Sequence, residues 1–543
     1  MADYTIPHIS SLKSSPSAFF TRPPFSSEIE RRRRYNLTRA LAHTLDRVNV
    51  LGDDGDYGHT GCVNALSWAQ DGDILLSASD DTTVRIWGID SRNNVQEYPF
   101  VCRSTIDTGH RANIFSAKML PLSSRIATAA GDGQVRILDV SAALSIRAGY
   151  GDTQTEFSSS QSCIRVIRCH HDSVKKIITE GSPDLFLSVS EDGSVRQHDL
   201  RTSHSCGAES CPAPLVDIGH ELSALSLSPL VPYQFVVAGE GSYGYLFDRR
   251  YLRRTIEHDW GMVPQAGKEP TTCVRKFGRE RSSSDKRVRR DHITGARMSK
   301  SNGHEVLFSY SGDGVYLFST KDEPKVNEDF FRGSQSPLHA EVRFYYNEII
   351  PDISPREVRT EGADESGEQD RTPQRAVLSL FDHLVSSSHE VDPRPDVPIV
   401  MPRRRYTGAR NVMTVKDVNF LGPDDEWVVS GSDDGNLFVW NKDSSTLQGI
   451  YEGDSSVVNV IEGHPHLPLL AVSGIDTTVK LFASTGLPSV FSRMDNAEQI
   501  INANRRLGST RFRRYDISAL LQEDPDSMGS EGIPTRVTEC IGQ

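Results

Sequence analysis

A fixed spacing between a histidine, an aspartate and an aromatic residue recurs along the chain. Asp81 follows His59 by 22 residues, and Trp87 follows Asp81 by six. Equal spacing between otherwise different sequences indicates one supersecondary unit used several times. The same spacings recur in two further sets, in which the last position is not tryptophan: His110, Asp132 and Leu138, then His170, Asp192 and His198.

The residue types of this unit can form a buried hydrogen-bond chain. A turn aspartate accepts from the histidine ring, the ring contacts a hydroxyl on the neighbouring strand (Ser77 or Ser79), and that hydroxyl reaches Trp87. A buried chain of this kind stabilises the fold only when every member is satisfied. The pattern is typical of the WD repeat, which forms one blade of a β-propeller. Structural roles are therefore expected for His59, Asp81, Trp87, His110, Asp132, His170, Asp192, His220, Asp434, Trp440 and Asp476.

Four degenerate units bring the total to seven. Each has a Val/Ile/Leu-rich strand, a Gly/Asp turn and a second strand, which is the pattern of short antiparallel strands. We predict an all-β fold, a seven-bladed WD-repeat propeller with an N-terminal helix and disordered insertions. The four units are His220 to Phe247 with Gly241 in the aspartate position, a weaker unit around Asp313, Asp434 to Trp440, and Asp454 to Phe482 with Asp454 in the histidine position.

The repeats place the propeller at residues 46–485. Residues 1–26 are rich in Ser and Pro and are expected to be disordered. A capping-box pattern at Ser27 and Glu30 predicts a helix near 28–46, so 1–45 form an N-terminal segment with a helix. Val48–Leu51 is expected to pair with the last blade and join the chain ends.

Several segments interrupt or follow the repeats. The segment 141–162 is interpreted as a link between blades two and three, and 486–543 as a C-terminal tail with one helix at 496–507. The other expected interruptions are a basic insertion at 253–290 and a long insertion at 321–405, with short helices possible at 338–350 and 375–386.

Composition restricts the function classes. The net charge of −13 argues against a surface built for nucleic acid, although basic clusters at 253–290 and 403–405 leave phosphate contact or nuclear import open beside a solvated loop. No stretch approaches the ~18 apolar residues of a membrane span. No phosphate loop or nucleophile motif is present, so neither an enzyme nor a cofactor is expected.

The eight cysteines include no CxxC pair and follow no secretory signal, which favours a reducing intracellular compartment, nuclear, cytoplasmic or both. His204, Cys206 and Cys211 lie in one loop, but their spacing does not suit zinc, so no metal is expected.

Two arginines follow the third strand of neighbouring units. Arg201 is the last residue of the sequence His-Asp-Leu-Arg, and Arg250 is the last residue of Phe-Asp-Arg-Arg. Both sequences match the motif W-D-x-R, with His198 or Phe247 in place of the tryptophan. On the propeller rim the two arginines could form one patch for carbonyls or carboxylates of a partner. The alternative is an ion pair within the blade, to Asp199 or Asp248. The predicted helix, with Leu37, Leu41 and Leu45 on one face, could likewise pack on its own propeller or dock into a partner.

The chain resembles the WD-repeat substrate receptors of cullin-4 ubiquitin ligases. The resemblance lies in Gly58-His-Thr-Gly-Cys-Val-Asn-Ala-Leu-Ser-Trp68 and Gly109-His-Arg-Ala-Asn-Ile-Phe-Ser-Ala-Lys118, and it covers about 46–250 and 405–485. The group includes the nuclear-receptor-interaction protein and the WD-and-tetratricopeptide-repeat protein. Members dock on the damage-specific DNA-binding adaptor subunit through an N-terminal helix and WDxR arginines. By this resemblance those roles map onto the helix around Leu37, Leu41 and Leu45, and onto Arg201 and Arg250.

The sequence therefore predicts a non-catalytic, monomeric substrate receptor that binds the ligase adaptor and an unidentified target protein. The alternative is a WD-repeat scaffold in chromatin or transcription complexes without a ligase.

Overall fold

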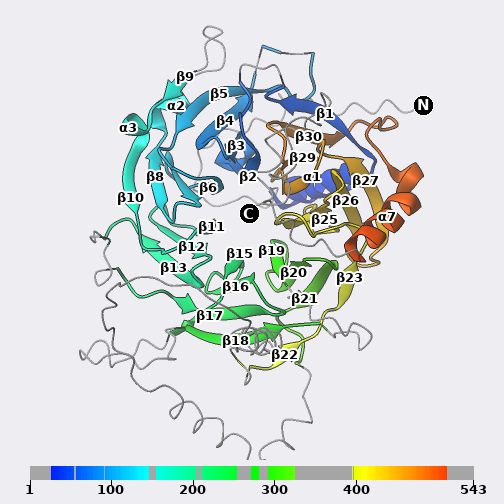
Figure 1. Ribbon diagram of the computed structural model, residues 1–543. Coiled ribbons are helices and arrows are strands. Elements are labelled where there is room, and N and C mark those ends of the chain that lie inside the picture. The colour runs from blue at the N-terminus through cyan, green and yellow to red at the C-terminus, as the bar shows by residue number, and fades with distance from the viewer. Residues whose placement is uncertain are drawn as a thin grey trace, which may run out of the picture.

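The protein forms a ring of seven antiparallel sheets around one axis (Figure 1). In this computed structural model the described residues are 26–53, 57–145 apart from 91 and 94, 155–202, 206, 211–252, 271–279, 292–324, 394 and 397–509. The predicted seven-bladed propeller is confirmed.

Blades 1 to 3 follow the order of the chain. Blade 1 consists of β2 (Val63–Ala69), β3 (Ile74–Ser79), β4 (Thr83–Ile89), β5 (Phe100–Asp107) and β9 (Thr155–Phe157). Blade 2 consists of β6 (Ile114–Met119), β7 (Arg125–Ala130), β8 (Val135–Asp139) and β10 (Cys163–Ile167). Blade 3 consists of β11 (Val174–Thr179), β12 (Leu185–Ser190), β13 (Ser194–Asp199) and the short β14 (Val216–Asp217).

Blades 4 to 7 complete the ring. Blade 4 consists of β15 (Leu222–Leu227), β16 (Gln234–Gly239), β17 (Gly244–Leu252), β18 (Thr271–Phe277) and β22 (Ile399–Val400). Blade 5 consists of β19 (Ile293–Met298), β20 (Glu305–Tyr310), β21 (Val315–Ser319) and β23 (Arg404–Tyr406). Blade 6 consists of β24 (Val418–Leu421), β25 (Trp427–Gly431), β26 (Asn436–Asn441) and β27 (Leu447–Glu452). Blade 7 consists of β28 (Val458–Gly463), β29 (Leu469–Gly474), β30 (Val479–Ser484) and β1 (Leu45–Leu51).

The core lies between neighbouring blades. Every residue of β3, β20 and β29 is buried, because a blade packs against another blade on each of its faces. A strand buried on both faces is a continuous apolar run rather than an alternating one. One apolar cluster accordingly joins blades 1 and 2, and another joins blades 3 and 4.

The ring is closed by the N-terminal strand. β1 pairs antiparallel with β30, from Leu45 opposite Ser484 to Leu51 opposite Val479. Leu45 and Leu51 are each only 2% exposed. The predicted outer strand at Val48–Leu51 is confirmed, and it begins three residues earlier. Closure of this kind leaves no long unpaired edge in blade 7.

The interruptions contain outer strands of the blades. The segment 141–162 was expected to link blades two and three, and this is wrong. It forms α2 (Ser141–Ser145), the parallel fifth strand β9 of blade 1 and α3 (Ser159–Ser162), and it then leads into β10, which is the fourth strand of blade 2. An outer strand faces solvent, so its Ser- and Thr-rich sequence lacks an apolar pattern.

The ranges 253–290 and 321–405 likewise contain β18, β22 and β23. The basic insertion predicted at 253–290 is described only at 271–279. The disorder predicted for 1–26 and the helices at 338–350 and 375–386 lie outside the described residues, apart from Ser26 itself, which begins a helix.

The two longest helices among the described residues lie outside the blades. α1 (Ser26–Leu41) ends before the predicted limit of 46, because the chain must turn into β1. α7 (Ala497–Ser509) confirms the helix expected near 496–507 and follows the short helix η5 (Met494–Asn496). Residues 486–509 are attached to blade 6 rather than being a free tail, since Ile500 and Ile501 pack on its apolar cluster and Ser492 bridges to Tyr451. Among the described residues, no helix combines the length and apolar character that a membrane crossing needs.

Candidate partner-binding surface

Hydrogen-bond chains of aspartate, histidine and a hydroxyl hold blades 1, 2 and 3, and in blade 2 Leu138 adds no fourth member. In blade 1, His59 Nδ1 lies 2.9 Å from Asp81 Oδ2, and His59 Nε2 lies 2.7 Å from Ser77 Oγ. The indole N–H of Trp87 donates to the same hydroxyl at 2.8 Å. Ser77 rather than Ser79 is thus the hydroxyl of the chain. Equivalent contacts join His110 to Asp132 and Thr128, and His170 to Asp192 and Ser188.

The electrostatics of the chains in blades 1 and 3 favour a neutral histidine. Burial lowers the pKa of His59, against the opposing effect of Asp81. Ser77 accepts from Trp87 and therefore donates its own proton to His59 Nε2, which leaves Nδ1–H to donate to Asp81. Burial alone raises the pKa of Asp81, but the bonds from His59, Thr83 and Thr60 outweigh it and hold that pKa well below its usual range.

In blade 3 a histidine takes the place of the tryptophan. His198 Nε2 lies 2.7 Å from Ser188 Oγ, and its ring stacks on Phe186 with the centroids 4.8 Å apart. The spacing had placed His198 in the tryptophan position, and the contact shows that an imidazole can fill that position.

The order Asp81–His59–Ser77 is that of a hydrolase triad. A nucleophile must reach a substrate carbonyl. Ser77 is fully buried and its hydroxyl is engaged by both His59 and Trp87. The arrangement therefore fixes a turn to a strand and does not present a reactive oxygen.

Blade 7 replaces the imidazole with an ammonium group. Lys480 Nζ lies 3.2 Å from Asp454 Oδ2 and 2.7 Å from Asp476 Oδ2. Asp454 and Asp476 lie where the repeat predicted them. Lys480 was missed, although a lysine between Val479 and Leu481 in an apolar strand was a signal. Burial raises the pKa of Asp454 to about 6, with Lys480 opposing the shift and the carboxylate of Asp476 adding to it.

Blade 6 divides the role of the turn aspartate between two residues. Asp433 accepts the backbone N–H groups of Val412 and Met413 and pairs with the buried Lys416 at 2.5 Å. Burial lowers the pKa of Lys416, against the opposing effect of Asp433. Asp433 thus makes the backbone contact that Asp81 makes with Thr60 in blade 1, while its charge is met by the ammonium group of Lys416.

The predicted residues Asp434 and Trp440 are structural in a different way. Asp434 accepts from Asn504 Nδ2 of α7 at 2.8 Å, so it anchors a helix rather than a histidine. Trp440 is buried and donates to the carbonyl of Thr407 at 3.1 Å.

The expected role of His220 in a buried chain is wrong. Its ring is half-exposed, and its Nδ1 lies 3.3 Å from the carbonyl of Glu221. The physical reason is that Gly241 stands in the aspartate position and offers no carboxylate.

Strand direction defines two faces of the ring. Because strands alternate in direction, the third strand of every blade ends on the same face, and the turns between second and third strands lie on the opposite one. We call the former the arginine face, which carries Arg201 and Arg250, and the latter the histidine face, which carries His59, His110 and His170.

Both arginines form the ion pair within their own blade. The Nε and Nη2 atoms of Arg201 donate to Asp199 at 2.9 and 2.7 Å, and those of Arg250 donate to Asp248 at 3.0 and 2.8 Å. Arg250 also lies over the ring of Tyr233, 3.6 Å from its centroid. The side chains nevertheless remain 64% and 55% exposed. The ion pair therefore fixes each guanidinium without covering it.

α1 lies on the arginine face, because it leads into β1 at the end where third strands finish. Thr38 Oγ1 donates to Glu426 at 2.6 Å, and Arg34 pairs with Asp424. Both acceptors belong to the loop between β24 and β25. These anchors were not predicted, since nothing in the sequence links residues almost 400 positions apart.

The leucines predicted to meet a partner are instead directed at the propeller. Leu41 and Leu45 are 7% and 2% exposed within the cluster of blades 6 and 7, and Leu37 is partly buried against it. Leu45 lies in β1 rather than in the helix. The exposed apolar side chains of α1 are Ile29 and Tyr35, at 62% and 64%.

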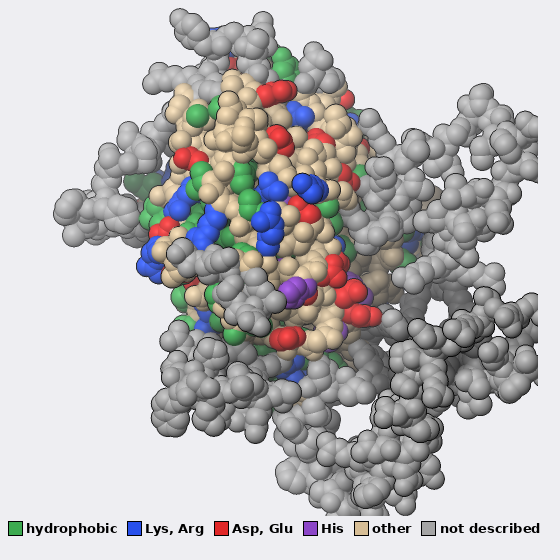
Figure 2. Space-filling view, turned by 60° about the vertical axis from the view of Figure 1, so that its left-hand side comes forward, with side chains coloured by type: hydrophobic (Ala, Val, Ile, Leu, Met, Phe, Trp, Pro, Cys, Tyr) green, Lys and Arg blue, Asp and Glu red, His purple; other side chains and the backbone are tan. Residues whose placement is uncertain are grey.

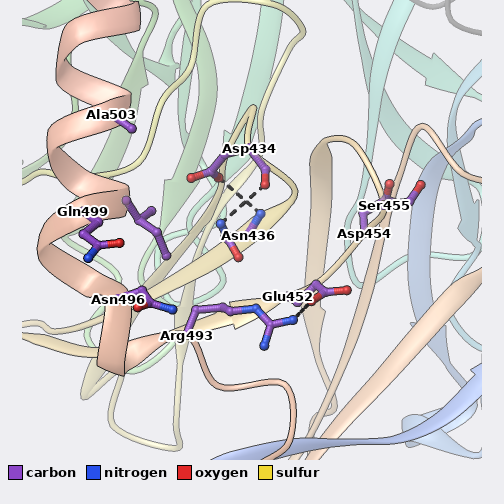
Figure 3. Close-up of a pocket in the computed structure, with 10 residues that line it drawn as sticks. Asp434, Asn436, Glu452, Asp454, Ser455, Arg493, Asn496, Gln499 and Ala503 are labelled. Carbon is purple, nitrogen blue, oxygen red and sulfur yellow. Dashed lines mark hydrogen bonds and ion pairs between the residues drawn. The ribbon is translucent and has the colours of Figure 1, made fainter. Parts of the chain in front are cut away.

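An open pocket of about 520 Å³ lies on the histidine face of blades 6 and 7, beside α7 (Figure 3). Asp434 and Asn436 face α7, while Asp454 and Ser455 lie across the opening. Arg493 crosses the floor and pairs with Glu452. The lining formed by the described residues is mostly polar, apart from Ile500 and Ala503, and includes no thiol or histidine.

The cysteines of the β13–β14 connection have a different neighbour from the one considered in the sequence. Cys206 and Cys211 lie beside Cys169, which precedes β11. His204 lies outside the described residues.

Comparison with known proteins agrees with this geometry. The family model for the WD domain, G-beta repeat, matches residues 54–88 and 402–441, in and around blades 1 and 6. The chain is 32% identical over 269 residues to DDB1- and CUL4-associated factor 6 of Homo sapiens, which covers 49% of this chain and 27% of that protein. The chain is a WD-repeat propeller that is similar in sequence to DDB1- and CUL4-associated factor 6.

Two other relatives extend the comparison. WD repeat protein iqw1 of Schizosaccharomyces pombe is 36% identical over 280 residues, covering 50% of this WD-repeat chain and 32% of the relative. WD and tetratricopeptide repeats protein 1 of Homo sapiens is 24% identical over 638 residues, covering 85% and 89%. The matches to iqw1 and to the human factor span about a third or less of the length of each of those proteins.

Proposed function

We propose that this protein is a non-catalytic substrate receptor of a cullin-4 ubiquitin ligase. It would act inside the cell as a monomeric propeller, in the nucleus, the cytoplasm or both. The ligase adaptor would bind the arginine face, and a target protein would bind elsewhere on the ring. The contribution to ubiquitination is proximity, which raises the effective concentration of the target lysine near the loaded enzyme.

The observation that carries the proposal is the placement of three features on one face. Arg201 and Arg250 stand on adjacent blades 3 and 4, and α1 lies across the ring on blades 6 and 7 (Figure 1). A relative of the chain is named for association with such an adaptor and cullin. A partner that covers the arginine face can therefore contact all three features at once.

The two guanidinium groups are suited to recognition because they are held in place before binding. Each is fixed by two bonds to its aspartate, so little side-chain entropy is lost when a partner arrives. Each guanidinium is planar and carries several N–H donors, a geometry that suits donation to carbonyl or carboxylate oxygens of a partner.

The helix offers a different contact from the one that its leucines suggested. Because Leu37 and Leu41 pack on the ring, a partner meets the outer side of α1, where Ile29 and Tyr35 are exposed. Arg31 and Arg32 lie beside them and pair with Glu28.

The test is binding of the purified full chain to the purified adaptor. The double variant Arg201→Ala, Arg250→Ala is expected to weaken binding at least about tenfold, as loss of two anchoring arginines does in other interfaces. Arg111→Ala is the matched control, because Arg111 is exposed on the histidine face. It should bind like the unaltered chain.

The outcomes separate the parts of the proposal. Unchanged binding by a folded double variant would remove the arginines from the interface. A combined Ile29→Asp, Tyr35→Ala variant tests α1 in the same assay, and unchanged binding would remove the helix. Failure of the unaltered chain to bind the adaptor would refute the receptor role.

A further inference from the structure

Three cysteines from two distant segments meet at the outer edge of blades 2 and 3. Cys169 lies in the turn between β10 and β11, and Cys206 and Cys211 lie in the connection between β13 and β14. Their Sγ atoms all lie within 4.8 Å of one another. Cys169 is 4% exposed, and the other two are partly buried against the same apolar cluster.

The spacing of the sulfurs matches that of a metal–thiolate centre. Zn–S bonds of about 2.3 Å in a tetrahedron place neighbouring sulfurs about 3.8 Å apart. Cys169 Sγ and Cys206 Sγ are 3.8 Å apart. A disulfide needs about 2.05 Å, and none of these three cysteines is disulfide-bonded. Pairing any two of them would also leave the third thiol unused.

The surroundings suit a centre with a net negative charge. One Zn²⁺ with three thiolates carries −1. The backbone N–H of Arg168 donates to Cys206 Sγ at 3.3 Å, which is a contact that stabilises a thiolate. Arg165 and Arg196 line a cavity of about 180 Å³ beside Cys169. Figure 2 brings the side of blades 2 and 3 forward and shows Lys and Arg side chains gathered across its middle.

Such a centre would attach the connection between β13 and β14 to the ring. β14 has only two residues, and it pairs with β13 at Ser194–Asp217 and Val195–Val216. Among the described residues, the outer strand of blade 3 is therefore attached to the ring by a short ladder. A metal shared between Cys169 and the two cysteines of the connection would attach it to blade 2.

We propose that Cys169, Cys206 and Cys211 bind one Zn²⁺ as a structural centre, with water from the adjoining cavity as the fourth ligand. On binding, three S–H bonds break, three Zn–S bonds form and three protons pass to solvent. Affinity consequently rises with pH. The spacing along the chain had argued against zinc because it considered only residues of one loop, and Cys169 is 37 residues from Cys206.

The test is the metal content of the full chain, purified through a tag that binds no metal. Elemental analysis after dialysis is expected to give about one zinc per chain. Cys206→Ser, Cys211→Ser should lose it. The matched control is Cys163→Ser, Cys273→Ser, since these two half-buried cysteines lie outside the cluster, and it should keep its zinc.

A second measurement does not depend on the folding of a variant. Co²⁺ added to the metal-free, reduced chain should give sulfur-to-cobalt charge-transfer bands and the intense visible bands of tetrahedral cobalt, and Zn²⁺ should abolish them. Absence of these bands while three thiols are reduced would overturn the proposal. So would equal zinc loss in the control variant, or a disulfide between Cys169 and Cys206 in the chain isolated under reducing conditions.

Discussion

Lys480 is the residue whose loss should reveal most clearly how a blade without histidine is held. Its side chain is 4% exposed and lies between two carboxylates, of which Asp454 is fully buried and Asp476 is 20% exposed. Lys480→Met keeps the length and apolar stem of the side chain but removes the ammonium. Asp454 then lies buried with no cation and with a second carboxylate nearby.

The magnitude follows from that burial. Removing one partner of a buried ion pair costs about 3–5 kcal/mol, because the other charge is left uncompensated. Asp454 can escape by taking up a proton, and its pKa is already raised to about 6 by burial. The loss of stability in Lys480→Met should therefore be close to the full value of about 3–5 kcal/mol at pH 8. It should be clearly smaller at pH 5, where Asp454 is protonated.

Thermal unfolding of the full chain at both pH values measures the effect. For a propeller of ~400 residues, 1 kcal/mol corresponds to about 1.2 °C, so a decrease in Tm of roughly 4–6 °C is expected at pH 8. The double variant Lys480→Met, Asp454→Asn should recover most of it. Lys321→Met, at an exposed lysine, is the control. An equal loss at both pH values, or no loss at pH 8, would refute the reasoning.

Two further predictions concern closure and acid sensitivity. Leu45→Ala should lower the free energy of unfolding by about 2–5 kcal/mol, because it leaves a cavity in the strand that closes the ring. Thermal unfolding measures this loss, with Leu122→Ala at an 85% exposed position as the control. Equal Tm values for the two variants would contradict the prediction. Burial lowers the pKa of His59 and His170. Below about pH 6.5 these two side chains therefore bind protons in the unfolded chain but not in the folded one. Stability should therefore fall as pH drops through this range, and the slope should weaken in His59→Gln, whereas an unchanged slope would count against the buried neutral imidazole.

Much of the architecture could be predicted from the sequence because the residue spacing within each repeat reflects the strand and turn lengths of one blade. The distance of 22 residues from His59 to Asp81 is the length of one strand pair with its turns, and it located the chains of blades 1 to 3 correctly. The same logic placed Asp454 opposite Asp476. It failed for His220, where a matching dipeptide lacked the aspartate that gives the histidine its role.

Outer strands and contacts between distant segments could not be predicted in this way. β9 and β23 face solvent and carry no apolar period, so the segments that contain them looked like linkers. The bond from Thr38 to Glu426 and the approach of Cys169 to Cys206 depend on how the ring closes, which no local pattern encodes. The leucines of α1 were recognised as one face, but periodicity does not tell whether such a face meets its own chain or another.

The pairing of β1 with β30 also sets an order for assembly. The seat of α1 consists of side chains from blades 6 and 7, which the ribosome makes last. A nascent or prematurely ended chain has no blade 7, so its first helix has no platform and the surface that we assign to the adaptor is incomplete. On the proposed function, only a finished ring would then recruit the ligase, so incomplete chains would not occupy the adaptor.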